Sequence, residues 1–287
     1  MDYKIALSVL LIAHFLGDFY FQSRKMAEEK NDSWLRMLAH GVIYALCIFA
    51  FAFLFFGLGV WRLPVIISVS HLLIDIVKRW LNRLNRVQKH PTRLFFIDQA
   101  AHIVIIGVIA YFYAITDGVA YSSYAMRLRE IYTGLELGLP AHRVIPLTCL
   151  FLFVWKPASI ITIKILQSVR ENGRVVPQKA QGEERITGDI GGQGVNLLLQ
   201  RRTGESKGTS SANQEPKAGK YIGILERSLT VIFFLLGQYT AIAFTLTAKS
   251  IARFKELENA DFAEQYLIGT LVSQLLAIAG AAMLGHF

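Results

Sequence analysis

Charged residues are scarce in this sequence. Asp, Glu, Lys and Arg make up 18% of the 287 residues, whereas a soluble domain carries roughly a quarter. Hydrophobic residues make up 53% and gather in runs of about 20, the length of a helix that crosses a bilayer. The shortage of charge excludes an ordinary soluble domain. The runs predict an all-α fold, a polytopic transmembrane bundle with six or seven spanning helices.

Cysteine is almost absent too. Cys47 and Cys149 both lie in apolar runs, where we expect small core residues rather than a disulfide or thiolate metal ligands. The net charge of +9 argues little for nucleic acid as a partner, because Lys and Arg gather in the cytoplasmic loops of membrane proteins. The first run also lacks the small-residue cleavage site of a signal peptide. Membrane lipid is therefore the expected partner, and nothing in the sequence identifies a protein partner.

Two local features divide the rest of the chain. Pro157 lies in the middle of the fifth apolar run and removes a backbone donor, which predicts a kink or a re-entrant piece. Residues 171–220 contain nine Gly and no aromatic residue, so they cannot bury enough apolar surface to order the chain. We therefore expect a four-helix transmembrane core (1–116), then a loop and a kinked or re-entrant fifth helix (117–170), then a flexible hydrophilic loop (171–220). The C-terminal region (221–287) is expected to contain two membrane helices, over about 222–248 and 266–283, joined by an amphipathic connector.

Histidine and aspartate recur four residues apart inside three of the first four runs. Side chains at i and i+4 lie on one face of a helix, one turn apart. Each pair can therefore aim an imidazole and a carboxylate at one point. The pairs are His14 with Asp18, His71 with Asp75 and, in reverse order, Asp98 with His102, and His40 opens the remaining run.

The orientation of the helices brings these pairs to one depth. The loops 23–37 and 82–93 are rich in Lys and Arg, which predicts that both are cytoplasmic and that the N-terminus is outside. When the first four helices alternate in direction, every His and Asp named above falls toward the cytoplasmic leaflet. The orientation beyond the fourth helix is left open, because it depends on whether the fifth helix spans.

Imidazole and carboxylate together suit Zn²⁺, Mn²⁺ or Fe²⁺, and helix bundles build metal sites from such pairs on facing helices. Seven candidates exceed one tetrahedral shell, so either two metals bind or some residues orient the ligands. A proton or ion pathway and a structural polar core are the alternatives. The candidate metal ligands are His14, Asp18, His40, His71, Asp75, Asp98 and His102, and the three aspartates are also candidate catalytic residues.

Four further polar residues are candidates for function. Lys78 follows Asp75 by three residues and is a candidate catalytic cation for an oxyanion or phosphate, or else a Lys that reaches the membrane boundary. Gln22 extends the face of Asp18 by one turn and is a candidate for substrate binding. Lys249 and Arg253 lie four residues apart and are candidates for holding a lipid phosphate. Their alternative is an amphipathic interface helix with internal ion pairs.

At these residues the chain resembles the bacterial membrane family catalogued as domain of unknown function 3307. The resemblance covers about residues 3–113, and short stretches of the C-terminal region are similar to longer members. It implies a multi-pass protein of the bacterial inner (plasma) membrane and no settled activity. More loosely, the His/Asp pattern is similar to bacterial membrane-bound metal-dependent hydrolases. The motifs that carry it are His14-Phe-Leu-Gly-Asp18 with Gln22, His40-Gly-Val-Ile-Tyr44, His71-Leu-Leu-Ile-Asp75 with Lys78, and Phe96-Ile-Asp98-Gln99-Ala-Ala-His102.

These observations favour a membrane-embedded, metal-dependent hydrolase that acts on a lipid-borne ester or phosphate. A bound divalent metal would lower the pKa of water and supply hydroxide near neutral pH. A non-enzymatic ion or proton transporter that uses the same buried groups is the first alternative, and a membrane scaffold is the second. The outer halves of the helices carry few polar residues, which argues against a path across the membrane.

Overall fold

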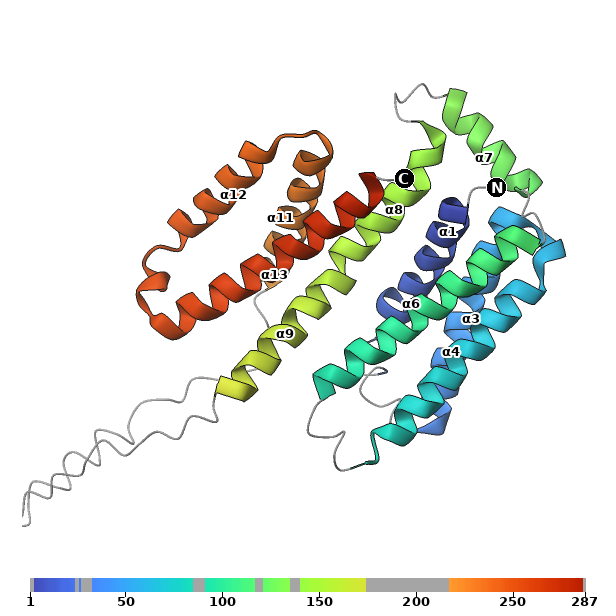
Figure 1. Cartoon of the computed structure of the whole chain (residues 1–287), viewed down its shortest axis with the longest axis horizontal. Helices are drawn as coiled ribbons and strands as arrows, with labels where there is room; N and C mark the ends of the chain where they lie inside the picture. Colours follow the sequence, from blue (N-terminus) through green and yellow to red (C-terminus); the bar gives the residue numbers. More distant parts are fainter. Residues whose placement is uncertain are drawn as a thin grey trace, which may run out of the picture.

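The computed structural model describes residues 3–23, 26, 33–84, 91–116, 121–134, 140–173 and 217–285, and all of its regular elements are helices. The all-α prediction is confirmed. Figure 1 shows two groups of helices on either side of the long α8–α9 rod. The loop predicted over 171–220 lies almost entirely outside the described residues. The N-terminal group contains α1 (Tyr3–Phe15), η1 (Leu16–Tyr20), α3 (Trp34–Phe56), η2 (Leu58–Val60), α4 (Arg62–Leu81) and α6 (Pro91–Thr116).

Helix α1 is the centre of the N-terminal group. Within the candidate span Tyr3–Tyr20, 67% of the residues are buried, against 28% for each of the spans that contain α3 and α6. Helices α3, α6 and α8 pack around α1, and α4 closes the group between α3 and α6. Because neighbouring helices cover most of α1, its polar residues face protein rather than lipid.

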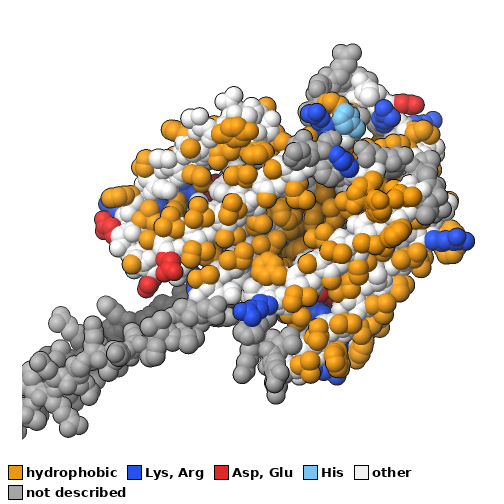
Figure 2. Space-filling view, viewed as in Figure 1, with side chains coloured by type: hydrophobic (Ala, Val, Ile, Leu, Met, Phe, Trp, Pro, Cys, Tyr) orange, Lys and Arg blue, Asp and Glu red, His pale blue; other side chains and the backbone are white. Residues whose placement is uncertain are grey.

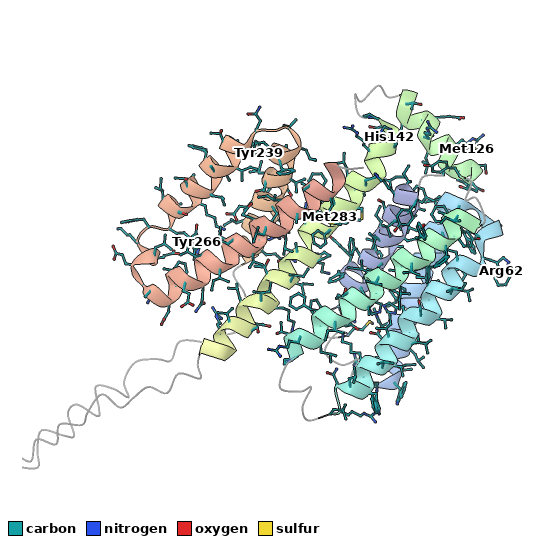
Figure 3. All side chains as sticks on the ribbon, in the orientation of Figure 1. Arg62, Met126, His142, Tyr239, Tyr266 and Met283 are labelled. Atoms are coloured by element: carbon teal, nitrogen blue, oxygen red, sulfur yellow. The ribbon has the colours of Figure 1, made fainter. Side chains whose placement is uncertain are left out.

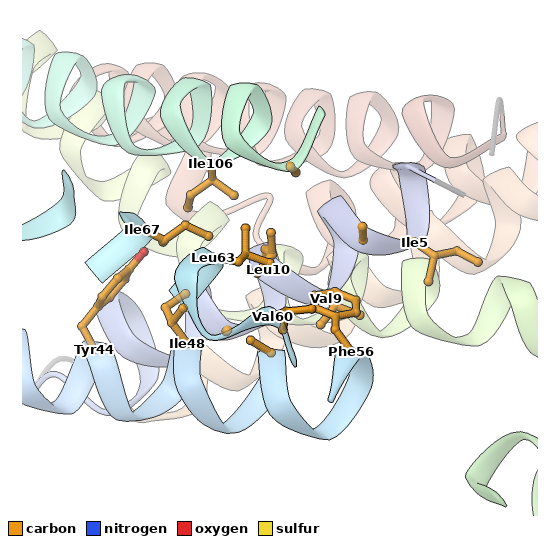
Figure 4. Close-up of a cluster of buried hydrophobic side chains, with 14 residues drawn as sticks. Ile5, Val9, Leu10, Tyr44, Ile48, Phe56, Val60, Leu63, Ile67 and Ile106 are labelled. Carbon is orange, nitrogen blue, oxygen red and sulfur yellow. The ribbon is translucent and has the colours of Figure 1, made fainter. Parts of the chain in front are cut away.

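A layer of aliphatic side chains fills the half of this group that lies away from the His/Asp residues. Figure 4 shows Leu10, Ile48, Leu63, Ile67 and Ile106 meeting between α1, α3, α4 and α6, and each is at most 2% exposed. Lipid tails are as apolar as these side chains, so close van der Waals packing holds the helices together here rather than the hydrophobic effect. The layer separates the His/Asp residues from the end of the bundle at which α1 begins.

Helices α7 (Ser123–Gly134), α8 (Ala141–Trp155) and α9 (Pro157–Gly173) follow. The break between α8 and α9 lies at Lys156, directly before Pro157, whose ring nitrogen has no hydrogen to donate. Residues His142–Arg170 still form one candidate span of 29 residues. The sequence predicted either a kink or a re-entrant piece at Pro157. The structure has a kink, because the chain continues beyond the break in one long rod.

The C-terminal group differs from the prediction of one helix over about 222–248. The structure has α11 (Lys217–Leu235), α12 (Tyr239–Ala252), η3 (Glu256–Glu258) and α13 (Ala260–Gly285). The chain reverses at Gly237, whose φ of 70° suits glycine. Apolar residues lie on both sides of this turn, so the sequence reads as one apolar run and does not predict the end of α11 before Gly237.

Arg227 joins this group to the helix break. The residue is 4% exposed, and its Nε donates to the carbonyl of Val154 at 2.6 Å while Nη2 donates to that of Trp155 at 3.4 Å. Nη1 donates to Ser273 Oγ of α13 at 3.2 Å. The kink frees carbonyls that an unbroken helix would use, and a buried guanidinium satisfies them.

Five segments in the described part of the chain are long and apolar enough to cross a membrane, judged by length and composition. Helix α4 is not among them, because Asp75, Lys78 and Arg79 lower its hydropathy. Figure 2 shows hydrophobic side chains along most of the helical surface and many of the charged ones near helix ends. The count of six or seven spanning helices stays a prediction. The five segments are Tyr3–Tyr20, Trp34–Phe56, Pro91–Ile115, His142–Arg170 and Ala260–Met283.

The fold also shows how the helices of the C-terminal group run relative to α1, which the sequence left open. Helices α1 and α8 run parallel: Ile5 and Ile145 line one cavity near their first residues, and the Tyr20 hydroxyl donates to the Leu152 carbonyl at 2.9 Å near their last. Helix α9 continues past the end of α1, where Arg170 Nε donates to Gln265 Oε1 of α13 at 3.0 Å. Figure 3 shows Tyr239, at the first residue of α12, and Tyr266 of α13 toward opposite ends of the group.

We expect the connection between α12 and α13 to be cytoplasmic. It lies at the same end as the last residues of η1 and α4, from which the loops 23–37 and 82–93 lead, and it carries Arg253 and Lys255, as the positive-inside rule predicts for a cytoplasmic segment. Reporter fusions at residue 255 and in the two loops should all show cytoplasmic activity, and a fusion at the Gly237 turn should show none. Activity at 237 without activity at 255 would contradict this orientation.

Candidate metal site

Four helices carry the predicted residues to one half of the N-terminal group, the half in which α1 ends. His14 lies near the end of α1 and Asp18 in η1, His40 lies on α3, His71 and Asp75 on α4, and Asp98 and His102 on α6. All seven are buried, with between 0% and 8% of each residue exposed. The i, i+4 spacing therefore does place each pair toward the interior of the bundle.

Asp18 lies in a single π-helical turn. Residues Leu16–Tyr20 form η1, and the Phe21 amide donates to the Leu16 carbonyl at 2.8 Å, five residues back. Such turns are rare and recur at functional sites, because they rotate the side chains relative to an α-helix. Asp18 consequently points to His40 and His71, whereas His14 contacts Tyr44 and His102. The sequence pattern does not reveal this extra rotation.

Asp18 is the centre of the polar contacts. Its Oδ1 lies 3.0 Å from His71 Nε2 and 3.1 Å from His40 Nε2. Gln99 Nε2 donates to its Oδ2 at 3.3 Å. Among the residues that the structure describes, neither Lys nor Arg contacts this carboxylate. A buried anion held by ordinarily neutral donors is costly, so a cation or a proton would stabilise the site.

His40 connects the two acidic sides of the cluster. Its Nε2 lies 3.1 Å from Asp18 Oδ1 and 3.5 Å from Asp75 Oδ2. Although both distances are short, His40 Nε2 makes no hydrogen bond within the described structure. A metal ion would interact with both carboxylates at once.

His102 has its tautomer fixed by the backbone. Its Nδ1 lies 2.8 Å from the Asp98 carbonyl oxygen, which can only accept, so Nδ1 must be the donor. In the neutral ring, Nε2 then carries a lone pair, and within the described structure this buried nitrogen has no hydrogen-bond partner. An imidazole held this way is the usual arrangement of a metal ligand.

Asp98 has a cation of its own. Lys78 Nζ lies 2.6 Å from Asp98 Oδ2, with 15% of the lysine side chain and 2% of the aspartate side chain exposed. Gln99 Nε2 also donates to this oxygen, at 3.2 Å. Lys78 therefore reaches the cluster rather than only the membrane boundary, and it neutralises the carboxylate on α6.

Three sets of side chains could each hold a metal ion. In each set the ligand atoms lie within 4.8 Å of one another. Ligands about 2.0–2.1 Å from a tetrahedral zinc are about 3.3 Å apart, close to the 3.0–3.5 Å contacts around Asp18 and His40. His14 belongs to none of the three. The sets are Asp18, His71 and His102; His40, His71 and Asp75; and Asp75, Asp98 and His102.

Tyr44 is a site residue that the sequence analysis did not select. Its ring stacks on His71 with centroids 3.5 Å apart, and its hydroxyl lies 3.3 Å from His14 Nδ1. The residue is 1% exposed. It follows His40 by four residues, so the spacing that selected the His/Asp pairs would have found it had tyrosine been included.

The candidates for substrate binding lie apart from the contacts of this cluster. Lys249 Nζ pairs with Glu226 of α11 at 2.7 Å and lies over the ring of Tyr266. Arg253 pairs with Glu256, three residues on, at 3.2 Å. The structure thus pairs both residues inside the C-terminal group, as an interface helix would. Gln22 follows η1, and its Nε2 has no hydrogen-bond partner among the described residues.

Comparison with known proteins supports one part of the resemblance. A family model described as a protein of unknown function (DUF3307) matches residues 6–130. That stretch contains all seven candidate ligands and Lys78. No curated protein and no solved structure matches the chain. The similarity to metal-dependent hydrolases is not shown by these comparisons.

Gly17 sets how closely η1 approaches α3. A Cβ at this position would lie 2.8 Å from Tyr44 Cδ2 and 3.2 Å from Tyr44 Cα. Gly17→Ala should therefore push the two helices apart and cost about 1–3 kcal/mol, as overpacking does. It should also lower metal content, because Asp18 and His40 would separate. Unfolding of the purified protein in detergent, with metal analysis, measures both effects.

Gly59→Ala is the matched control, since a Cβ there has nothing within 4 Å. It should leave the unfolding temperature and metal content unchanged. Equal behaviour of the two variants would show that the contact between η1 and α3 does not determine the site.

Proposed function

We propose that the protein is a membrane-embedded, metal-dependent hydrolase that acts on a lipid-borne ester or phosphate. The observation that carries the proposal is the buried carboxylate of Asp18, placed 3.0–3.1 Å from two imidazole nitrogens with no cationic side chain among its described contacts. Imidazole with carboxylate suits Zn²⁺, Mn²⁺ or Fe²⁺. Asp18, His71 and His102 would hold the ion, with His40 beside Asp18 able to complete the shell.

A bound divalent ion would activate water at a pH near neutral. The chain supplies the groups that position and deprotonate such a water. Asp98 is the candidate general base, because Oδ1 has no hydrogen-bond partner among the described residues while Lys78 holds Oδ2. Lys78, whose side chain is 15% exposed, would meet a phosphate or a developing oxyanion.

The aliphatic layer favours a hydrolase over a transporter. A carrier needs polar groups from one face of the membrane to the other. Above the His/Asp level, however, Leu10, Ile48 and Ile106 are at most 2% exposed and pack in an apolar cluster. This layer closes the cluster on one side, so a substrate would have to enter and leave by the same leaflet.

Metal analysis of the detergent-purified protein tests the site. We expect a bound divalent metal in the unaltered protein and its loss in His71→Ala, because His71 belongs to two of the three ligand sets. Leu72→Ala, on the same turn of α4, should retain the metal. Equal metal content in these three proteins would show that the cluster is a structural polar network.

Asp98→Asn separates binding from turnover. The amide keeps the shape of the side chain but is a far weaker base, so metal should remain while hydrolysis of lipid phosphate or ester substrates falls by about 10²–10⁴-fold. Flux assays in proteoliposomes provide the competing measurement. Metal-dependent ion flux, with no hydrolysis by the unaltered protein, would favour the transporter.

A further inference from the structure

An apolar cavity lies at the opposite end of α1 from the His/Asp cluster. It has a volume of about 320 Å³ and opens between α7, α8 and the first turns of α1. Its lining is mainly apolar and includes Ile5, Phe55, Leu128 and Ile145. The volume is at the lower end of the range for small-molecule sites, and the lining suits a hydrocarbon chain better than a polar ligand.

Helix α7 forms one wall of this cavity and is anchored to α3. The Ser122 amide donates to the Phe55 carbonyl at 2.9 Å, and the Ser122 hydroxyl donates to that of Leu54. The same hydroxyl accepts from the Ala125 amide at 3.0 Å and so caps α7. These contacts hold α7 in place, which is typical of a preformed binding site.

One face of α7 points to the cavity and another to the surroundings. Four residues at helical spacing line the cavity, namely Ala125, Leu128, Arg129 and Tyr132. Met126, on another face, is 50% exposed. Helix α7 therefore carries apolar side chains both in the cavity and on its exposed face, as an interfacial helix does.

The mouth of the cavity is basic. Arg129 and His142 lie among its lining residues, and Arg127 and Arg143 are exposed close by in the sequence, against one acid, Glu130, among the described residues 121–134 and 140–143. Figure 2 shows basic side chains and a His gathered over α7 and the start of α8, where the basic residues are arginines, and Figure 3 labels His142 there. The predicted topology places these arginines on the outer side of the membrane. The positive-inside rule does not account for arginines there, but a ligand that they bind would.

We propose that this cavity binds one acyl chain of an anionic phospholipid, with Arg129 on the headgroup phosphate. A guanidinium pairs with phosphate through two parallel hydrogen bonds. The apolar lining receives the chain, and the open side of the cavity lets the second chain remain in the bilayer. The site is independent of the metal proposal, because it uses no residue of the His/Asp cluster.

Native mass spectrometry of the full-length protein in detergent, titrated with dioleoyl phosphatidylglycerol and dioleoyl phosphatidylethanolamine, tests the site. Arg129→Gln should weaken phosphatidylglycerol binding about tenfold, the effect of one charge-assisted contact, with a smaller effect on phosphatidylethanolamine. Ala125→Phe should fill the cavity and weaken both lipids. Metal content should be unchanged in both variants.

Arg127→Gln is the control, since Arg127 has the same charge on the same helix but is not among the residues that line the cavity. It should bind both lipids as the unaltered protein does. Equal losses from Arg127→Gln and Arg129→Gln would indicate diffuse attraction at the surface and overturn the proposal. Unchanged binding by Ala125→Phe, with α-helical content retained, would overturn it as well.

Discussion

A carboxylate in the interior of an apolar bundle must be balanced by donors or by a cation, and Asp18 sets this requirement for the N-terminal half of the protein. Its described contacts include His40, His71 and Gln99, each from a different helix. Those helices have to converge at one level for the charge to be tolerated. The same convergence places the nitrogen and oxygen atoms at the separations that a metal ion needs.

Two backbone features make that convergence possible. The π-helical turn rotates Asp18 away from the line of His14, and Gly17 lacks the side chain that would keep η1 from Tyr44. Both lie in the short stretch that joins His14 to Asp18. The stretch therefore contributes its backbone geometry to the site as well as its two polar side chains. Tyr44, which packs against Gly17, also contacts the rings of His14 and His71.

The two halves of the chain handle buried polarity differently. In the N-terminal group, several polar atoms such as His102 Nε2 have no hydrogen-bond partner among the described residues, as expected of side chains that bind a ligand. In the C-terminal group, Arg227 donates to two carbonyls and a hydroxyl, and Lys249 pairs with Glu226. The second group therefore has the character of a satisfied structural core against the α8–α9 break.

The sequence by itself determined the helical class and the buried faces of the His/Asp residues, because a 3.6-residue period fixes which side chains share a face. It also predicted a common level for these residues, from helix directions based on the Lys and Arg of the loops. It did not determine the reversal at Gly237, since apolar character continues through that turn. Nor did it determine which atoms meet. The contacts of Asp18 with His71, and of Lys78 with Asp98, join residues 53 and 20 positions apart. Only helix packing decides such contacts, because they depend on how the helices cross and on how far the π-turn rotates Asp18.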